Sequence, residues 1–228
     1  AMIAAARKNG RMLSVFHNRR WDGDYMTIKD VIARGLIGEV FHIEACMGNY
    51  GHPGFWWRSD KRIAGGAFYD WGAHVCDWVL GLVPSEIAEV SGHFQPKRVW
   101  HDVTNEDHCS AMVRFANGVS AHIELSHLAA VGKRRWRILG TRGGIEDSPH
   151  GQNTFRVVSY KEGVRLESDV AYRESDWHAY YRNVADHLLT GAPLAVTPES
   201  ARRVIALIET AEQSSRAGKA MPVPKHCR

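Results

Sequence analysis

The chain has 228 residues, of which 44% are hydrophobic and 24% charged, with a formal net charge of +4. This composition is typical of a globular protein, and the length suits one large domain or two small ones. The basic residues form no run, which argues against nucleic-acid binding, and no apolar run reaches the ~20 residues of a membrane helix. No signal-peptide pattern is present. Four cysteines lack CxxC pairing and metal-ligand spacing, so we expect buried free thiols in a reducing, cytoplasmic compartment: Cys46, Cys76, Cys109 and Cys227.

The first seventeen residues have the pattern of a helix, a glycine and a short apolar strand. Residues 1–9 are rich in alanine, Gly10 is placed to cap their helix, and residues 12–17 are predicted to form the strand. Such an order is the second half of a βαβ unit, and a buried parallel strand needs neighbours that nothing upstream supplies. We therefore predict that residues 1–17 are the remnant of an N-terminal domain and that residues 18–228 form a C-terminal domain.

The rest of the chain predicts an α+β fold. A helix over 24–34, a strand over 39–48 and a loop over 50–62 precede a helix that contains Asp70. Alternating apolar and polar residues then predict an open, mostly antiparallel sheet with helices packed on one face. The dipeptide Asn117-Gly118 predicts a type I′ hairpin turn. The remaining predicted elements are strands over 86–95, 107–115, 119–127, 135–140, 144–147, 154–160 and 164–171, followed by helices over 177–189 and 198–216.

The segment from Gly65 to Trp78 carries the strongest candidate for chemistry. Asp70, His74 and Asp77 recur at i, i+4 and i+7, which places them on one stripe of a helix beside an apolar stripe. An imidazole beside a carboxylate can move a proton near neutral pH, and the glycine pair would let a ligand approach the backbone. A structural interpretation is equally open, because Asp–His pairs at this spacing also occur as solvated surface pairs.

The loop before the glycine pair and the segment after the first strand supply further candidates. Arg58 and Trp56 could line a sugar or polyol pocket, with Tyr50 and Asp77 as further substrate contacts. The alternative is that Arg58 pairs with Asp60 while the tryptophans pack. Arg19 and Arg20 follow a strand end, where α/β sheets bind ligands, so they are candidate cofactor contacts; a surface position is the alternative for each.

A metal site is not expected from the sequence. Among the thirteen histidines, only His74 belongs to a helical set with carboxylates, and no HExxH or three-ligand spacing is present. A metal-dependent hydrolase that uses Asp70, His74 and Asp77 is therefore the weakest of the functional hypotheses.

The order of motifs resembles the Gfo/Idh/MocA family of NAD(P)-dependent oxidoreductases. The matching segments are NRRWD at 18–22, IARGLIGEV at 32–40, WRSD at 57–60, the block 65–77 and ILGTRGGI at 138–145. The resemblance implies that residues 1–17 are the last helix and strand of a Rossmann domain, and that Asp70 and His74 are the catalytic pair. It also implies a homodimer or homotetramer through the polar sheet face, which carries Ser120, His122, Glu124 and Ser126.

Two family motifs are absent from the chain. No G-x-G-x-x-G is present, and the glycines at 140–144 lead into a strand and not a helix, so they predict a turn. The Glu-Lys-Pro motif, whose lysine works with the Asp/His pair in the family, is also missing. We therefore expect the C-terminal fragment of a nicotinamide-dependent oxidoreductase for a sugar, polyol or related hydroxy compound. NAD or NADP would bind mainly to the missing N-terminal domain, and the isolated chain would be inactive. The alternative is a non-catalytic dimerisation or ligand-binding module.

Overall fold

An eight-stranded sheet forms the centre of the computed structural model, which describes residues 1–95, 97–149, 152–224 and 227. Its strand order is β2-β3-β4-β1-β5-β6-β7-β8. The strands are β1 (Val40–Gly48), β2 (Ile87–Phe94), β3 (His108–Phe115), β4 (Ser120–Ser126), β5 (Trp136–Gly140), β6 (Gly143–Asp147), β7 (Thr154–Lys161) and β8 (Val164–Ala171).

One pairing in the sheet is parallel and the other six are antiparallel. Strands β1 and β4 run side by side in the same direction, from the pair His42 and Ser120 to the pair Gly48 and Ser126. All other neighbours are antiparallel. The predicted open, mostly antiparallel sheet is therefore confirmed. The parallel pair brings the carboxyl ends of β1 and β4 to the same edge.

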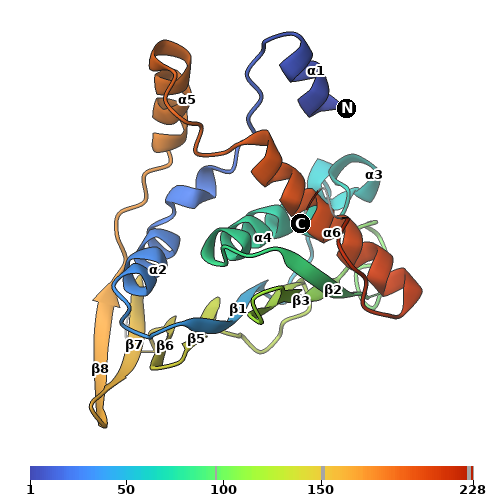
Figure 1. Cartoon of the computed structure of the whole chain (residues 1–228). Helices are drawn as coiled ribbons and strands as arrows, with labels where there is room; N and C mark the ends of the chain where they lie inside the picture. The colour runs from blue at the N-terminus through green and yellow to red at the C-terminus, as the bar shows by residue number, and fades with distance from the viewer. Residues whose placement is uncertain (96, 150–151, 225–226, 228) are drawn as a thin grey trace.

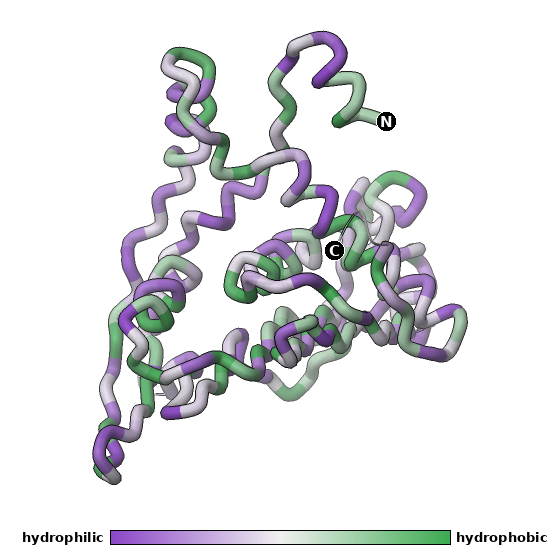
Figure 2. The backbone as a smooth tube through the Cα atoms, viewed as in Figure 1, coloured by the Kyte–Doolittle hydropathy of each residue, from purple (hydrophilic) through white to green (hydrophobic). Residues whose placement is uncertain are grey.

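Three helices lie on one side of the sheet: α2 (Gly23–Ala33), α4 (Trp71–Leu82) and α6 (Pro198–Ala217) (Figure 1). The core lies between these two layers. Trp78 of α4 packs between Tyr25 and Trp136, at ring-centroid distances of 6.2 and 5.5 Å. Apolar and polar residues alternate along the strands, as the colours of Figure 2 show. The apolar residues that alternate along β3 are buried: Cys109, Ala111, Val113 and Phe115.

On the opposite face of the sheet, the described part of the chain places no helix (Figure 1). Ser120, His122 and Glu124 are partly buried there, as the alternation predicts. Glu44 of β1 pairs with Arg137 and, at 3.2 Å, with Lys133. A broad polar face of this kind is suited to a second protein surface, and the homo-oligomer stays a prediction.

Residues 12–17 do not form the predicted strand. Helix α1 (Met2–Lys8) is present, but it buries no residue, and the segment after it has no strand partner among the described residues. Val15 and Phe16 are 41% and 47% exposed. A strand requires a neighbouring ladder of backbone hydrogen bonds, and among the described residues the backbone of this segment has only local ones, such as His17 N–H to the Val15 carbonyl. Its one bond to a distant carbonyl in the described chain comes from a side chain, the Ser14 hydroxyl, which donates to Val196 at 2.9 Å. The division into two domains at residue 17 stays a prediction.

The turn at Asn117-Gly118 differs from the predicted type. A type I′ turn needs positive φ at both central residues, but only Gly118 has it, with φ of +88°. The Gly118 N–H donates to the Phe115 carbonyl, which makes a three-residue loop with a type I turn followed by a left-handed glycine. Both residues between β7 and β8, Glu162 and Gly163, have positive φ instead.

The remaining elements are short or lie at the end of the chain. The predicted loop at 50–62 contains a 3-10 turn, η2 (Trp57–Ser59), and the start of α3 (Lys61–Ala64). Two further 3-10 turns are η1 (Asn18–Trp21) and η3 (Ala67–Tyr69), and α5 (Ala179–Thr190) projects from the sheet like α1 (Figure 1). Within the described part of the chain, every helix is too short or too polar to cross a membrane.

Candidate functional site

A cavity of about 500 Å³ opens at the edge where β1 and β4 end. The parallel pairing creates it, because the loops that leave both strands emerge at the same place. Helix α4 and the segment before it close the other side. The lining includes Trp56, Arg58, Asp70, Trp71, Asn105 and His127.

Three of the predicted site residues meet in this cavity. An Arg58 Nη1 donates to Asp70 Oδ1 at 2.5 Å. The Arg58 guanidinium also lies over the rings of Trp56 and Trp57, 5.2 and 4.8 Å from their centroids. Asp60 pairs instead with Arg62, so the alternative partner considered for Arg58 is not used. The Arg58 Nε is buried without an acceptor, which leaves one hydrogen-bond donor of this guanidinium unused.

Asp70 lies just outside helix α4 and not in its first turn. It occupies the N-cap position with φ of −91° and ψ of −99°, and its side chain caps no backbone N–H. The glycine pair precedes it with φ of +87° and +120° at Gly65 and Gly66. A Cβ on these glycines would lie 2.9 Å from Tyr69 Cγ and 2.7 Å from Glu106 Oε2. The glycines are thus required by backbone conformation and packing against this chain.

His74 is a neutral, partly buried imidazole next to Trp71, a residue of the cavity wall. Its ring meets His17 and Trp71 edge-on, at centroid distances of 5.7 and 5.8 Å. Burial, together with the charges of His17 and Arg19, lowers the pKa of His74 to about 4. The Nδ1 atom is buried without a hydrogen-bond partner. No hydrogen bond joins His74 to Asp70 among the described side chains, and Trp71, which the imidazole contacts, is a lining residue of the cavity.

Asp77, which follows His74 by three residues on α4, forms an ion pair with Arg20. Arg20 donates to both oxygens of Asp77 at 2.7 and 2.6 Å, and the Asp77 side chain is 3% exposed. His17 Nδ1 lies 4.0 Å from the same carboxylate. The predicted stripe is therefore divided into three environments. The donor atoms of Asp70, His74 and Asp77 do not converge as metal ligands.

Arg19 and Tyr50 lie outside the cavity wall. The Arg19 guanidinium is held between the rings of Trp71 and Trp177, 4.8 and 5.1 Å from their centroids. Tyr50 packs against Trp100 at 5.7 Å and stays 56% exposed. Arg19 and His74 both contact the Trp71 ring, and the charge of Arg19 contributes to the low pKa of that imidazole.

Asn105 is a cavity residue that the sequence analysis did not identify. It is 4% exposed, its Nδ2 donates to the Arg58 carbonyl, and its Oδ1 is buried without a partner. Asn105 therefore fixes the backbone of Arg58 and holds an unused acceptor beside it. No local pattern marks this residue, because it lies in a turn 47 positions after Arg58.

Among the described residues, one group of three metal-type donors is close enough to share an ion, and it lies on the open sheet face. The donor atoms of Cys46, His122 and Glu124 are within 4.8 Å of one another. The Lys133 ammonium lies 3.7 Å from Glu124, and burial raises the pKa of Cys46 to about 11. The group thus already has a cation beside it and a protonated thiol.

Residues 25–146 match the family described as GFO/IDH/MocA C-terminal domain. The chain is 26% identical over 236 residues to scyllo-inositol 2-dehydrogenase (NADP(+)) IolW of Bacillus subtilis, a match that covers 93% of this chain and 64% of that protein. It is 24% identical over 224 residues to myo-inositol 2-dehydrogenase of Thermotoga maritima, covering 93% and 65%. The chain thus spans about two thirds of the length of these relatives.

A solved structure has a similar fold over nearly the whole chain. The aldose-aldose oxidoreductase of Caulobacter crescentus, crystallised with glycerol, superposes with a TM-score of 0.79 at 20% identity. The superposition covers 97% of this chain and 67% of that one. At 20% sequence identity, the superposition shows that the two proteins share a fold.

Proposed function

Because this chain belongs to the Gfo/Idh/MocA family, we propose that it forms the substrate-binding part of a nicotinamide-dependent oxidoreductase for a sugar, polyol or related hydroxy compound. The family and the oxidoreductase names of its relatives support the reaction class. The substrate class rests on the inositol and aldose names of those proteins together with the cavity described above.

The observation that carries the proposal is the set of unused polar atoms at the cavity. Arg58 Nε is a donor and Asn105 Oδ1 an acceptor, and both are buried without partners. A hydroxyl group both donates and accepts hydrogen bonds, so a substrate with several hydroxyls can satisfy both atoms. The tryptophan rings at the rim offer apolar surface to the C–H face of such a substrate.

In this proposal, Asp70 binds a substrate hydroxyl and His74 takes part in proton transfer. Asp70 keeps one oxygen on Arg58, and its other oxygen can accept from the reacting hydroxyl. His74 is neutral at pH 7 and can therefore accept a proton as the alcohol is oxidised. Since His74 is not among the lining residues of the cavity, the proposal routes the proton from the substrate to His74 through a water molecule. The nicotinamide, when bound, accepts or delivers the hydride.

The residues present suit the substrate better than the dinucleotide. Among the described residues, no G-x-G-x-x-G turn joins a strand to a helix, and the glycines at 143 and 144 lie in β6. We infer that NAD or NADP is held mainly by a nucleotide-binding domain to which α1 and residues 11–17 belong. The support for this is that α1 buries no residue and Phe16 is exposed. Arg19 is our candidate for a cofactor contact from this chain.

The assembly and compartment are part of the same proposal. We infer a homodimer or homotetramer through the open sheet face, supported by the partly buried polar residues of β4. A cytoplasmic location is supported by four free, buried cysteines.

The test uses the full-length gene product and the absorbance change of the nicotinamide. Myo-inositol, scyllo-inositol and simple aldoses are offered with each cofactor. We expect His74→Gln to lower kcat by roughly 10²–10⁴-fold while binding of the cofactor is kept. His93→Gln, which changes an exposed histidine, serves as the matched control. A folded His74→Gln enzyme with unchanged kcat would refute the catalytic role.

A non-catalytic binding module is the second candidate, favoured by the missing hydrogen bond between Asp70 and His74. The binding-module hypothesis predicts that an inositol binds the 228-residue chain, while the full-length product turns over none of the offered compounds. Calorimetric titration of the chain measures the binding, and the nicotinamide absorbance assay measures the turnover. Our proposal expects weak or absent binding of NAD and NADP to the isolated chain.

A further inference from the structure

A second cavity, of about 290 Å³, lies where α2, α4 and α6 meet, and its lining is rich in cations. It is separate from the cavity at the strand ends, since none of its lining residues belongs to both. Its charged and hydroxyl-bearing lining residues are Arg20, Tyr25, Lys29, Asp77, Ser200 and Arg203.

Three of these groups are already satisfied by one another. Both oxygens of Asp77 accept hydrogen bonds from Arg20. Arg20 also donates to the Ser200 hydroxyl at 3.1 Å, and that hydroxyl donates to the Thr197 carbonyl at 2.8 Å. The carboxylate in the cavity wall is therefore neutralised, and it offers little repulsion or attraction to a further ion.

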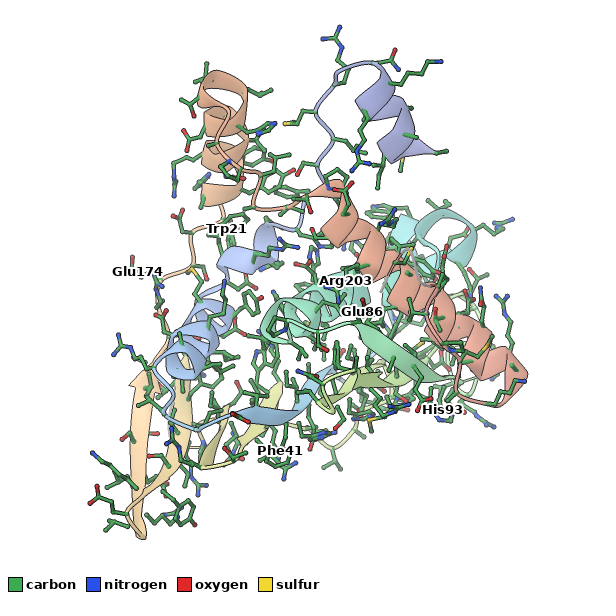
Figure 3. The ribbon with its side chains drawn as sticks, viewed as in Figure 1. Trp21, Phe41, Glu86, His93, Glu174 and Arg203 are labelled. Atoms are coloured by element: carbon green, nitrogen blue, oxygen red, sulfur yellow. The ribbon has the colours of Figure 1, made fainter. Side chains whose placement is uncertain are left out.

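Arg203 is a cation without an ionic partner in the described part of the chain. Its Nη2 donates to the Ser85 carbonyl at 2.8 Å, while its Nε is buried and has no acceptor. Glu86 lies in the same region (Figure 3), but it forms no salt bridge with Arg203. Burial lowers the pKa of Arg203, and the charge of Glu86 only partly opposes this. A guanidinium in this position gains from an added anion.

Two further donors face the same space. Tyr25 is 3% exposed, and its hydroxyl has no hydrogen-bond partner among the described residues. It points at Gly81, where a Cβ would lie 2.2 Å from the hydroxyl oxygen. The Lys29 ammonium lies 5.8 Å from the Tyr25 ring and is likewise without a carboxylate partner in the described chain. The Tyr25 hydroxyl lines the cavity and is not one of the fully buried atoms without a partner, so a ligand in the cavity can accept its proton.

We propose that this cavity binds a small oxyanion, a phosphate group, through Arg203, Lys29 and the Tyr25 hydroxyl. Arg203 and Lys29 carry only donors, the Tyr25 hydroxyl can donate as well as accept, and the one acid in the lining is already paired, so the cavity favours an anionic ligand rich in acceptors. The volume equals that of about ten water molecules at ~30 Å³ each, which admits inorganic phosphate or a small phosphorylated molecule. The site does not depend on the function proposed above.

Calorimetric titration of the 228-residue chain with inorganic phosphate at low ionic strength tests the site. We expect saturable binding that Arg203→Gln weakens by about 10- to 100-fold and Tyr25→Phe by about tenfold. Arg202→Gln removes the same charge from an exposed neighbour on α6 and should leave binding unchanged. If Arg203→Gln lowers the urea midpoint too far to keep the chain folded, Tyr25→Phe decides alone, since it deletes one oxygen and keeps the ring.

Glycerol 3-phosphate in parallel distinguishes the two sources of the phosphate group. Tighter binding than inorganic phosphate assigns the site to a phosphorylated organic molecule, and weaker binding assigns it to the free ion. The proposal is overturned if phosphate gives no saturable binding. It is also overturned if Arg202→Gln weakens binding as much as Arg203→Gln does, because that result describes a general surface attraction.

Discussion

Replacing His74 with glutamine should make the stability of this chain less sensitive to acid. Burial holds the pKa of His74 at about 4 in the folded state, against 6.5 for an ordinary histidine. Between these two pH values the unfolded chain binds a proton that the folded chain does not. The contribution of His74 to stability is therefore complete above pH 6.5 and is lost as the pH falls toward 4.

The size of the effect follows from the two pKa values. Between pH 7.5 and pH 5 the linkage amounts to at most about 2 kcal/mol of unfolding free energy, and water at the partly exposed ring reduces it to about 1–2 kcal/mol. Other histidines with a lowered pKa, such as His17 and His127, also make the folded chain less stable as the pH falls. The difference between wild type and variant isolates His74 from them.

Urea unfolding at a series of pH values measures this difference. The wild type should lose about 1–2 kcal/mol more than His74→Gln over the interval, whereas the exposed-site control His93→Gln should follow the wild type. Only the pH dependence matters, because the glutamine itself can change stability at pH 7.5. Parallel curves for wild type and His74→Gln would show that the imidazole is hydrated in the folded state. The argument for a neutral buried base would then fail.

Three other substitutions test the packing and the assembly. Gly92→Ala should lower the urea midpoint strongly, because its Cβ would lie 2.0 Å from the Ala211 carbonyl oxygen of α6, whereas Gly132→Ala has open space and should change little. Trp136→Phe should cost roughly 2–4 kcal/mol of unfolding free energy, since it opens a space in the core and removes the 2.9 Å hydrogen bond to the buried Asp24; an unchanged midpoint would contradict this. Met112→Arg, in register with His122 on the open face, should convert a dimer into a monomer by light scattering, and a wild type that is already monomeric would contradict the predicted interface.

The strands could be predicted well because their signal is local. In β3 and β4, alternation along a few residues determines which side chains are buried, and the alternating apolar residues, such as Ile123, are buried in the structure. The order of the strands could not be predicted in this way. The parallel pairing of Ile43 with Ala121 joins segments 78 residues apart, and nothing in either strand specifies its partner.

In the site, too, local sequence patterns identified single residues but not the contacts between residues that are distant in sequence. Arg58 and Asp70 were predicted separately, and the structure shows that they pair, although Asp60 was the nearer partner in sequence. Helical periodicity predicted one stripe from Asp70 to Asp77. In the structure Asp70 lies outside α4, and each carboxylate pairs with a different arginine. Asn105 could not be identified at all, because its importance arises only from the backbone it contacts.

The single parallel pair at the centre of the sheet also bears on how this fold can change its specificity. Loops 49–57 and 127–135 leave β1 and β4 at the same edge, and both contribute lining residues to the cavity, including Trp56 and Lys133. The strands themselves are anchored by buried residues such as Ile43 and Ile123. Insertions or exchanges in either loop would therefore reshape the pocket while the hydrogen-bond register of the sheet stays intact. A scaffold of this kind allows substrate preference to diverge faster than the fold, and libraries confined to these two loops are the direct way to alter it.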